Sequence, residues 1–447
     1  MEETKSSQVS WRPVNGRAEL TLIVDTPRGL FMRRIPDALP LPADVEPGPG
    51  AEMATHTAAA TWGLPDFVFV PALAQKGSGR RELGDRILIA GRRAAVVQVK
   101  SRTVAPKAED AERAWINKVA GKAVRQAKGT VRMLRLAEAE FVNGRGRTLT
   151  VRGQDYEWIA VVVLDHHQVP AGTVACWEDP GMPAIAVTRR DWDFLFDQLR
   201  STTAVLDYLF RAAGQPQAAL DDEPVRYYEL AAADAAAAPG SVDTTLVGEG
   251  GRLWSSPLLP QVPAGRDDTH AHLMTRILLE DIARSPLPAY ATEADRHLML
   301  SDLDRLPVSA RTEWGQLLLE MLDDVPNVAQ DEHKWRFRRQ VDSDGRRQLI
   351  LGCTTRFSEL VQRAFSGYVQ LRQHEAVERT GDPENVSTLG VLLTPRTDGL
   401  RPWDTTAVRV SGPSDLSPEE LEGYRSLWNG TFEDGRVRFP APPASTP

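Results

Sequence analysis

Three polar residues border an apolar pair of predicted strands, and their types suit chemistry on phosphodiester bonds. The stretch RILIAGRRAAVVQVK (residues 86–100) holds two β-rich runs around residues 91–92. A two-residue loop that begins with Gly suits a type II′ hairpin turn. In that register Asp85 lies opposite Gln98, and Lys100 shares the face of Gln98 because side chains alternate along a strand. The hairpin therefore predicts one polar cluster at its open end.

The chemistry expected of this cluster is metal-assisted hydrolysis. A carboxylate from Asp85 and the amide oxygen of Gln98 are hard ligands of the kind that Mg²⁺ or Mn²⁺ takes. Glu82, three residues before Asp85, adds a second carboxylate from the preceding loop. Lys100 cannot bind a metal while protonated, but it can orient a water or stabilise charge that develops on a phosphate. The predicted catalytic residues and metal ligands thus share one surface.

With "GD…QVK" on two apolar strands and a basic helix after them, the chain resembles the restriction-endonuclease-like, or PD-(D/E)xK, nuclease superfamily. It is most similar to the Mrr-type subset, which has Gln as the first residue of the (E/Q)xK pair. The resemblance covers residues 51–213 and implies αβββαβ order. It implies that Asp85 binds the metal, that Gln98 is the second ligand and that Lys100 is the motif lysine.

The resemblance also implies roles for residues outside the hairpin. Glu82 has a looser counterpart in an acidic residue near the motif Asp, and Gln126 in a polar residue on the following helix. Pro65-Asp66 spells the family's "PD", but Asp66 opens the preceding strand, so we prefer Asp85. The implied activity is Mg²⁺-dependent endonuclease cleavage of DNA, in restriction or antiphage defence.

Charge is distributed unevenly along the chain. The net charge is −8, yet residues 72–155 carry 19 Lys and Arg against 8 Asp and Glu. A local basic excess in an acidic chain is the expected footprint of a polyanion. The residues predicted to contact nucleic acid are Arg80, Arg81, Arg92, Arg93, Lys118, Lys122, Arg125, Lys128 and Gln126. Ordinary solvated basic faces remain the alternative interpretation of such counts.

The elements that must position these residues follow from hydrophobic patterning. In the first half we expect strands at 18–25 and 30–35, a helix at 51–62, a strand at 67–71, a polar loop over 75–81, a helix at 109–141, strands at 157–164 and 184–187, and a helix at 191–213. In the second half we expect helices at 269–283, 310–322 and 358–378 and strands at 335–341, 347–352 and 388–393.

The expected fold class is α/β (α+β), a restriction-endonuclease-like mixed sheet flanked by helices, with a second C-terminal α/β domain. The predicted divisions are an N-terminal hairpin and Pro/Gly connector (1–50), a nuclease domain (51–215), an acidic Ala/Pro/Gly linker (216–265), a C-terminal α/β domain of unknown role (266–435) and a disordered tail (436–447).

Composition narrows the function classes. The 447 residues are 42% hydrophobic. They contain no apolar run long enough to span a bilayer and no pattern of a secretory signal, so we expect a cytoplasmic protein without a membrane partner. No Gly-rich nucleotide loop is present. The expected partner is DNA, with a homodimer or a defence-system protein as further expectations. The alternatives are an idle nuclease-fold module that binds nucleic acid or a protein, and a regulatory protein whose C-terminal half carries the function.

Overall fold

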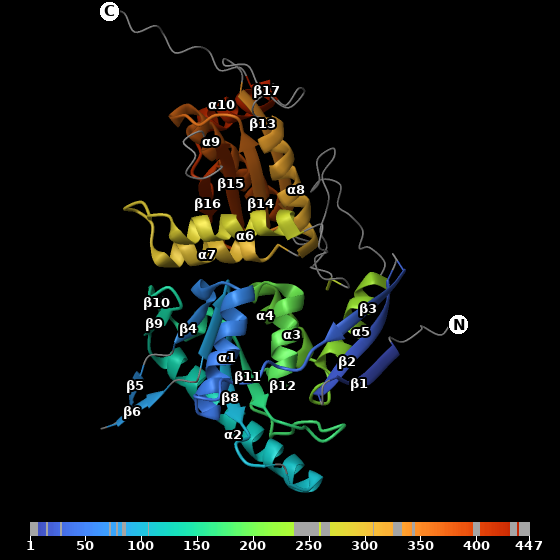
Figure 1. The fold of residues 1–447 in the computed structure, drawn as a ribbon. Coiled ribbons are helices and arrows are strands. Elements are labelled where there is room, and N and C mark those ends of the chain that lie inside the picture. The colour runs from blue at the N-terminus through green and yellow to red at the C-terminus, as the bar shows by residue number, and fades with distance from the viewer. Residues whose placement is uncertain are drawn as a thin grey trace, which may run out of the picture. The chain divides into compact units, whose positions relative to one another are not determined.

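The chain forms two compact units in the computed structural model (Figure 1). The described residues are 8–14, 17–26, 29–70, 73–76, 79–82, 86–105, 107–236, 259–260, 269–306, 308–324, 333–341, 345–396, 403–429 and 436–437. The first unit comprises Met1–Ala237, Leu259–Pro263 and Leu287–Val308, and the second takes in Ala264–Pro286 and Ser309–Pro447. Each unit is described below by itself.

A seven-stranded mixed sheet forms the centre of the first unit, in the order β10-β9-β4-β7-β8-β11-β12. Its strands are β4 (Val68–Val70), β7 (Arg86–Ala90), β8 (Arg93–Ser101), β9 (Ala139–Asn143), β10 (Thr148–Val151), β11 (Glu157–Asp165) and β12 (Ala184–Thr188). β4 is antiparallel to β7, and β7 is antiparallel to β8, whereas β11 is parallel to β8. A parallel pair needs a crossover, and helix α2 (Glu109–Leu136) lies in this one.

Helices cover both faces of this sheet. Ala94 and Val96 of β8 share a buried cluster with Ala127 and Val131 of α2, so these alternate residues mark the α2 face. Arg86 lies on the other face and donates to His56 Nδ1 of α1 (Pro47–Trp62) at 3.2 Å. Helices α3 (Arg189–Leu199) and α4 (Thr202–Ala213) complete the α1 layer through contacts with α1, β7 and β8.

A second, smaller sheet lies at the N-terminus of the first unit. β1 (Gln8–Val14), β2 (Arg17–Thr26) and β3 (Gly29–Ile35) form an antiparallel meander, which confirms the predicted hairpin. Helix α5 (Glu223–Ala236) contacts β2 and carries the buried Tyr227 and Tyr228. This helix falls within the stretch expected to be a linker. It forms part of the first unit because its two tyrosines are buried, despite the Ala-rich composition around them.

Other elements also differ from the sequence prediction, and α1 begins at Pro47, inside the expected Pro/Gly connector. Helix α2 ends at Leu136, because the chain turns back and pairs as β9. The helix expected over 191–213 is split: Arg200 adopts φ 49°, which ends α3, and Ser201 then caps α4. The expected polar loop over 75–81 instead contains the ribbon of β5 (Leu73–Lys76) and β6 (Gly79–Glu82).

The second unit is α/β as well, so the coarse expectation of a mixed α/β protein is confirmed. Its sheet order is β16-β15-β14-β13-β17. The strands are β13 (His333–Val341), β14 (Arg347–Thr354), β15 (Ser387–Pro395), β16 (Trp403–Ser411) and β17 (Arg436–Val437), and the helices are α6 (Thr269–Arg284), α8 (Val308–Asp324), α9 (Glu359–Thr380) and α10 (Pro418–Asn429). Trp335, Phe365 and Trp428 pack in one core. Among the described residues, no helix is both long and apolar enough to cross a bilayer.

Candidate active site

The β7–β8 hairpin has the register expected from its sequence. Arg86 pairs with Val97 and Ala90 with Arg93. Gly91 has φ +60° whereas Arg92 does not take a positive φ, as a type II′ turn requires. The register prediction is therefore confirmed over the described part of the hairpin. Asp85, the predicted metal ligand, lies outside the described residues.

Gln98 and Lys100 lie on the α2 face of the sheet, at the carboxyl end of β8. The side chain of Gln98 is almost fully buried, and Lys100 is half-buried. The Lys100 ammonium donates to Gln98 Oε1 at 3.2 Å and to the carbonyl oxygen of Val99 at 2.9 Å. The two predicted site residues are thus brought together, with the amide oxygen turned toward the positive charge.

The other residues expected around the hairpin divide into two groups. Arg80, Arg81 and Glu82 belong to β6, whose side chains lie outside the described part of the chain. Arg92 and Arg93 are at the closed end of the hairpin. At about 3.3 Å per residue, Arg93 lies about 17 Å along β8 from Gln98, so neither arginine borders the polar pair.

Arg93 has a structural role instead. Its guanidinium contacts the Glu157 carboxylate at 3.2 Å and the Asp207 carboxylate at 2.7 Å, and it lies 4.8 Å from the centre of the Phe210 ring. The charge of this guanidinium is therefore already paired with two carboxylates and one aromatic ring of the protein. The expectation that Arg93 contacts nucleic acid is therefore not supported by its surroundings.

The outer surface of α2 carries an uninterrupted basic stripe. Residues 113–136 include seven Lys and Arg and no Asp or Glu. The predicted contact residues Lys118, Lys122, Arg125 and Lys128 are all exposed. Within the described residues none of these four forms an ion pair, so their charge is available to an external anion.

The two flanks of α2 face different strands. Asn117 Oδ1 accepts from the backbone N–H of Cys176 at 3.0 Å, and Gly121 adjoins Trp177, so this flank faces the β11–β12 connection. At 100° per residue, Lys122 and Gln126 lie on the opposite flank, toward β7. In the described part of the chain, the buried Gln126 Oε1 has no hydrogen-bond partner. This flank therefore offers an unsatisfied acceptor on the hairpin side.

A buried network that the sequence analysis missed fixes the start of α2. The Arg102 guanidinium donates to both Glu112 carboxylate oxygens at 2.9 Å and stacks on Trp115. His166 Nδ1 accepts from a backbone N–H, so its Nε2 carries the proton donated to Glu112 at 2.9 Å. Hydrogen bonds from Arg102 and from the Lys107 amide hold the pKa of Glu112 well below its usual range.

Such a network leaves one signal in the sequence. Glu112 occupies the buried face of α2 four residues before Ile116, and an acid on an apolar helical face requires a partner. That partner, Arg102, comes directly after β8. The side chains of Glu112 and His166 are almost fully buried, so this network is a structural anchor. His166, which directly follows β11, is accounted for by this network.

On the α1 face of the sheet, the ends of β8 and β11 are held by a second set of hydrogen bonds. Asp165, at the end of β11, accepts from Ser101 Oγ at 2.8 Å and from Arg189 Nε at 2.9 Å. Asp193 lies near this pair, and burial raises its pKa to about 7. Because Ser101 directly follows Lys100, the backbone of the predicted catalytic lysine is held from both faces of the sheet.

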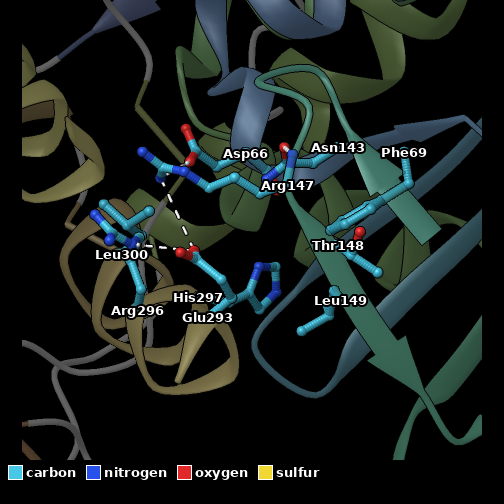
Figure 2. A pocket seen from close by; sticks show the side chains of 10 residues that line it. All are labelled: Asp66, Phe69, Asn143, Arg147, Thr148, Leu149, Glu293, Arg296, His297 and Leu300. Atoms are coloured by element: carbon cyan, nitrogen blue, oxygen red, sulfur yellow. Dashed lines mark hydrogen bonds and ion pairs between the residues drawn. The ribbon is translucent and has the colours of Figure 1, made fainter. Parts of the chain in front are cut away.

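The literal "PD" of the sequence belongs to a separate, polar pocket (Figure 2). Asp66 follows Pro65 in the 3₁₀ turn η1 (Pro65–Phe67), is buried, and accepts a hydrogen bond from Arg145 Nε. Figure 2 shows Glu293 of helix α7 (Glu293–Asp304) among the residues that line this pocket. Asp66 is thus engaged in this pocket by ion pairs with Arg145 and Arg147.

Metal binding and similarity to known proteins are the two remaining sources of information about the chemistry of the site. Among the described residues, no group of three or more His, Cys, Asp and Glu side chains could hold a metal ion. On the face shared by Gln98 and Lys100, the described side-chain oxygen of the hairpin is the Gln98 amide. The fit of a metal there depends on carboxylates from residues 82 and 85. In comparisons with known proteins, no family model matches the chain, and no curated protein or solved structure is significantly similar to it.

Proposed function

We propose that the first unit is a metal-dependent nuclease that hydrolyses phosphodiester bonds in DNA and has the restriction-endonuclease-like fold. The element order α1, β4, β7, β8, α2, β11 corresponds to the αβββαβ order of that superfamily. The sheet order β4-β7-β8-β11, with only the last pair parallel, supports the same assignment. Fold alone does not carry the activity, which must be argued from the site.

The observation that carries the proposal is the β7–β8 register. One further pair in that register would join Asp85 to Gln98, two residues from Lys100. Mg²⁺ or Mn²⁺ would be held by Asp85, Gln98 and Glu82, and when bound it would supply charge stabilisation to the phosphate. Lys100 would hold a proton near the reacting phosphate, while the basic surface of α2 would position the DNA backbone.

The test is cleavage of duplex DNA, single-stranded DNA and RNA with Mg²⁺ or Mn²⁺. Lys100→Met should reduce the turnover number by at least about a hundredfold with little change in DNA affinity, since its role is in the transition state. Asp85→Ala should remove both activity and metal dependence. Lys107→Met, the same substitution at an exposed lysine seven residues on, is the matched control.

The outcomes separate the proposal from its alternative. Full cleavage by both variants would refute the site. DNA binding without metal-dependent cleavage by the parent would instead identify a catalytically idle nuclease-fold module. The Gln126 oxygen and the charges of Lys118, Lys122, Arg125 and Lys128 favour a ligand in either case. Within the described residues this oxygen has no hydrogen-bond partner and these four side chains form no ion pair.

A further inference from the structure

Helix α7 belongs to the first unit although the chain on both sides of it belongs to the second. The segment Leu287–Val308 clusters with the first unit, and Ala264–Pro286 and Ser309–Pro447 with the second. Within the first unit α7 contacts β7, β10 and α4. The second unit is therefore tethered, at both ends of this segment, to a helix that docks beside the β7–β8 hairpin.

The carboxyl half of α7 is held by two polar contacts. The backbone N–H of Gly91, in the hairpin turn, donates to Ser301 Oγ at 2.9 Å. The Asp304 carboxylate accepts from Ser201 Oγ and from the N–H of Thr203, both at 2.9 Å, and so completes the cap of α4. Docking of α7 thus fixes the turn of the hairpin and the start of a core helix.

The middle of α7 is held by a histidine in an apolar setting. The His297 ring centre lies 5.3 Å from that of Phe67 and 5.9 Å from that of Phe69, edge-on to the first and tilted to the second. Its Nε2 is buried and makes no hydrogen bond within the described residues. The adjoining pocket has room for about one water molecule. A proton added to Nε2 would therefore have no hydrogen-bond acceptor among the described residues.

The charged groups around His297 do not compensate for protonation. The pocket is lined by the carboxylates of Asp66 and Glu293 and by the guanidinium groups of Arg147 and Arg296. Glu293 is already engaged with Arg296 at 3.1 Å and with Arg147 at 3.9 Å (Figure 2). The two carboxylates are matched by cations, and burial lowers the pKa of His297 to about 4.

We propose that α7 is a detachable docking helix, and that protonation of His297 releases it from the hairpin turn and the start of α4. The sign follows from linkage. An undocked imidazole takes up a proton near pH 6.5, whereas the docked one stays neutral to lower pH, so docking is strongest above pH 6.5 and weakens as the pH falls. Between pH 7.5 and pH 5.0 the docking constant should fall about 30-fold.

Hydrogen–deuterium exchange on the full chain tests this proposal. Protection factors, corrected for the intrinsic effect of pH, are compared at pH 7.5 and pH 5.0. Peptides from α7 should lose about 30-fold in protection, and peptides from β8 and β11 should not change. His297→Leu keeps an apolar side chain between the two phenylalanines and should abolish the pH response while α7 stays protected. His374→Leu, on α9 of the second unit, is the matched control and should retain the response.

Ser301→Ala keeps the proposal testable if His297→Leu fails to fold. Loss of the bond to the Gly91 N–H should lower α7 protection at both pH values and leave its pH dependence intact. Equal protection of α7 at both pH values in the parent would overturn the proposal. A full pH response in His297→Leu would also overturn it, because the response would then belong to Asp66 or Glu293.

Discussion

The basic stripe on α2 makes a quantitative prediction about how nucleic acid is held. Lys122 lies on the flank toward β7 and Arg125 on the crest of the helix, whereas Lys128 and Arg135 follow Gly121 at seven-residue intervals on the flank toward the β11–β12 connection. If DNA occupies the hairpin side, Lys122→Gln with Arg125→Gln removes two phosphate contacts. Lys128→Gln with Arg135→Gln removes the same charge from the far side and serves as the matched control.

The expected magnitude follows from counterion release. Each neutralised phosphate contributes about −0.9 to the slope of log affinity against log salt on duplex DNA, so the first variant should flatten the slope by about 1.8. If the contribution vanishes near 1 M salt, affinity should fall about 200-fold at 50 mM and about 20-fold at 200 mM. The control should change the slope by less than one unit, because its two side chains lie on the flank away from the hairpin. The two variants carry equal net charge, so a general loss of charge would affect both alike.

Fluorescence anisotropy with labelled duplexes at several salt concentrations measures both slopes. The loss should be the same for unrelated sequences, since phosphate contacts carry no sequence information. Equal slopes for the parent and the Lys122/Arg125 variant would show that this part of α2 is a solvated face. Equal losses in the two variants would show that DNA lies along the crest without preference for the hairpin side.

Three other substitutions test the site and its support. Gln98→Glu adds a carboxylate at the proposed metal site and should lower the Mg²⁺ concentration for half-maximal cleavage; an unchanged midpoint would separate Gln98 from the metal. Glu112→Gln should weaken the acid dependence of stability in urea titrations. The pKa of Glu112 is depressed by Arg102, so its contribution is present above about pH 4.5 and is lost as the pH falls. Gly153→Ala would place a methyl carbon 2.5 Å from the backbone of α2 and should destabilise the fold by about 1–3 kcal/mol, whereas Gly48→Ala in open space should not.

The hairpin could be predicted because its determinants are local. Gly91 supplies the positive φ of the turn, and the alternation on both sides then sets the pairing and the faces of the strands. The same alternation placed Gln98 and Lys100 together. The mixed α/β class followed from β-rich runs separated by amphipathic helices, which is a statement about local patterning too.

The elements that were missed depend on partners far away in the sequence. The break between α3 and α4 is stabilised by Ser201, whose hydroxyl bonds to Asp304 across 103 positions. Helix α7 was not expected because its buried face mixes Leu300 and Leu303 with polar residues and forms no continuous apolar stripe. Glu112 likewise has meaning only once Arg102 and His166 are in place. Buried polar groups in this fold find their hydrogen-bond partners far away in the sequence, and local sequence patterns do not predict these pairs.

The identity of Gln98 bears on how metal binding and DNA binding are divided along the chain. A buried amide needs hydrogen bonds but no counter-charge, so Gln98 can lie under α2 with Lys100 as a donor. It keeps an oxygen for a metal but supplies no charge, and the negative charge must then come from Asp85 and Glu82, which precede β7. The positive charge proposed to hold DNA is on α2, more than 20 residues after Asp85. In the proposed nuclease, separate segments carry the two functions. Substitutions in the segment before β7 should therefore alter the metal requirement, and substitutions on α2 should alter affinity for DNA, each without the other.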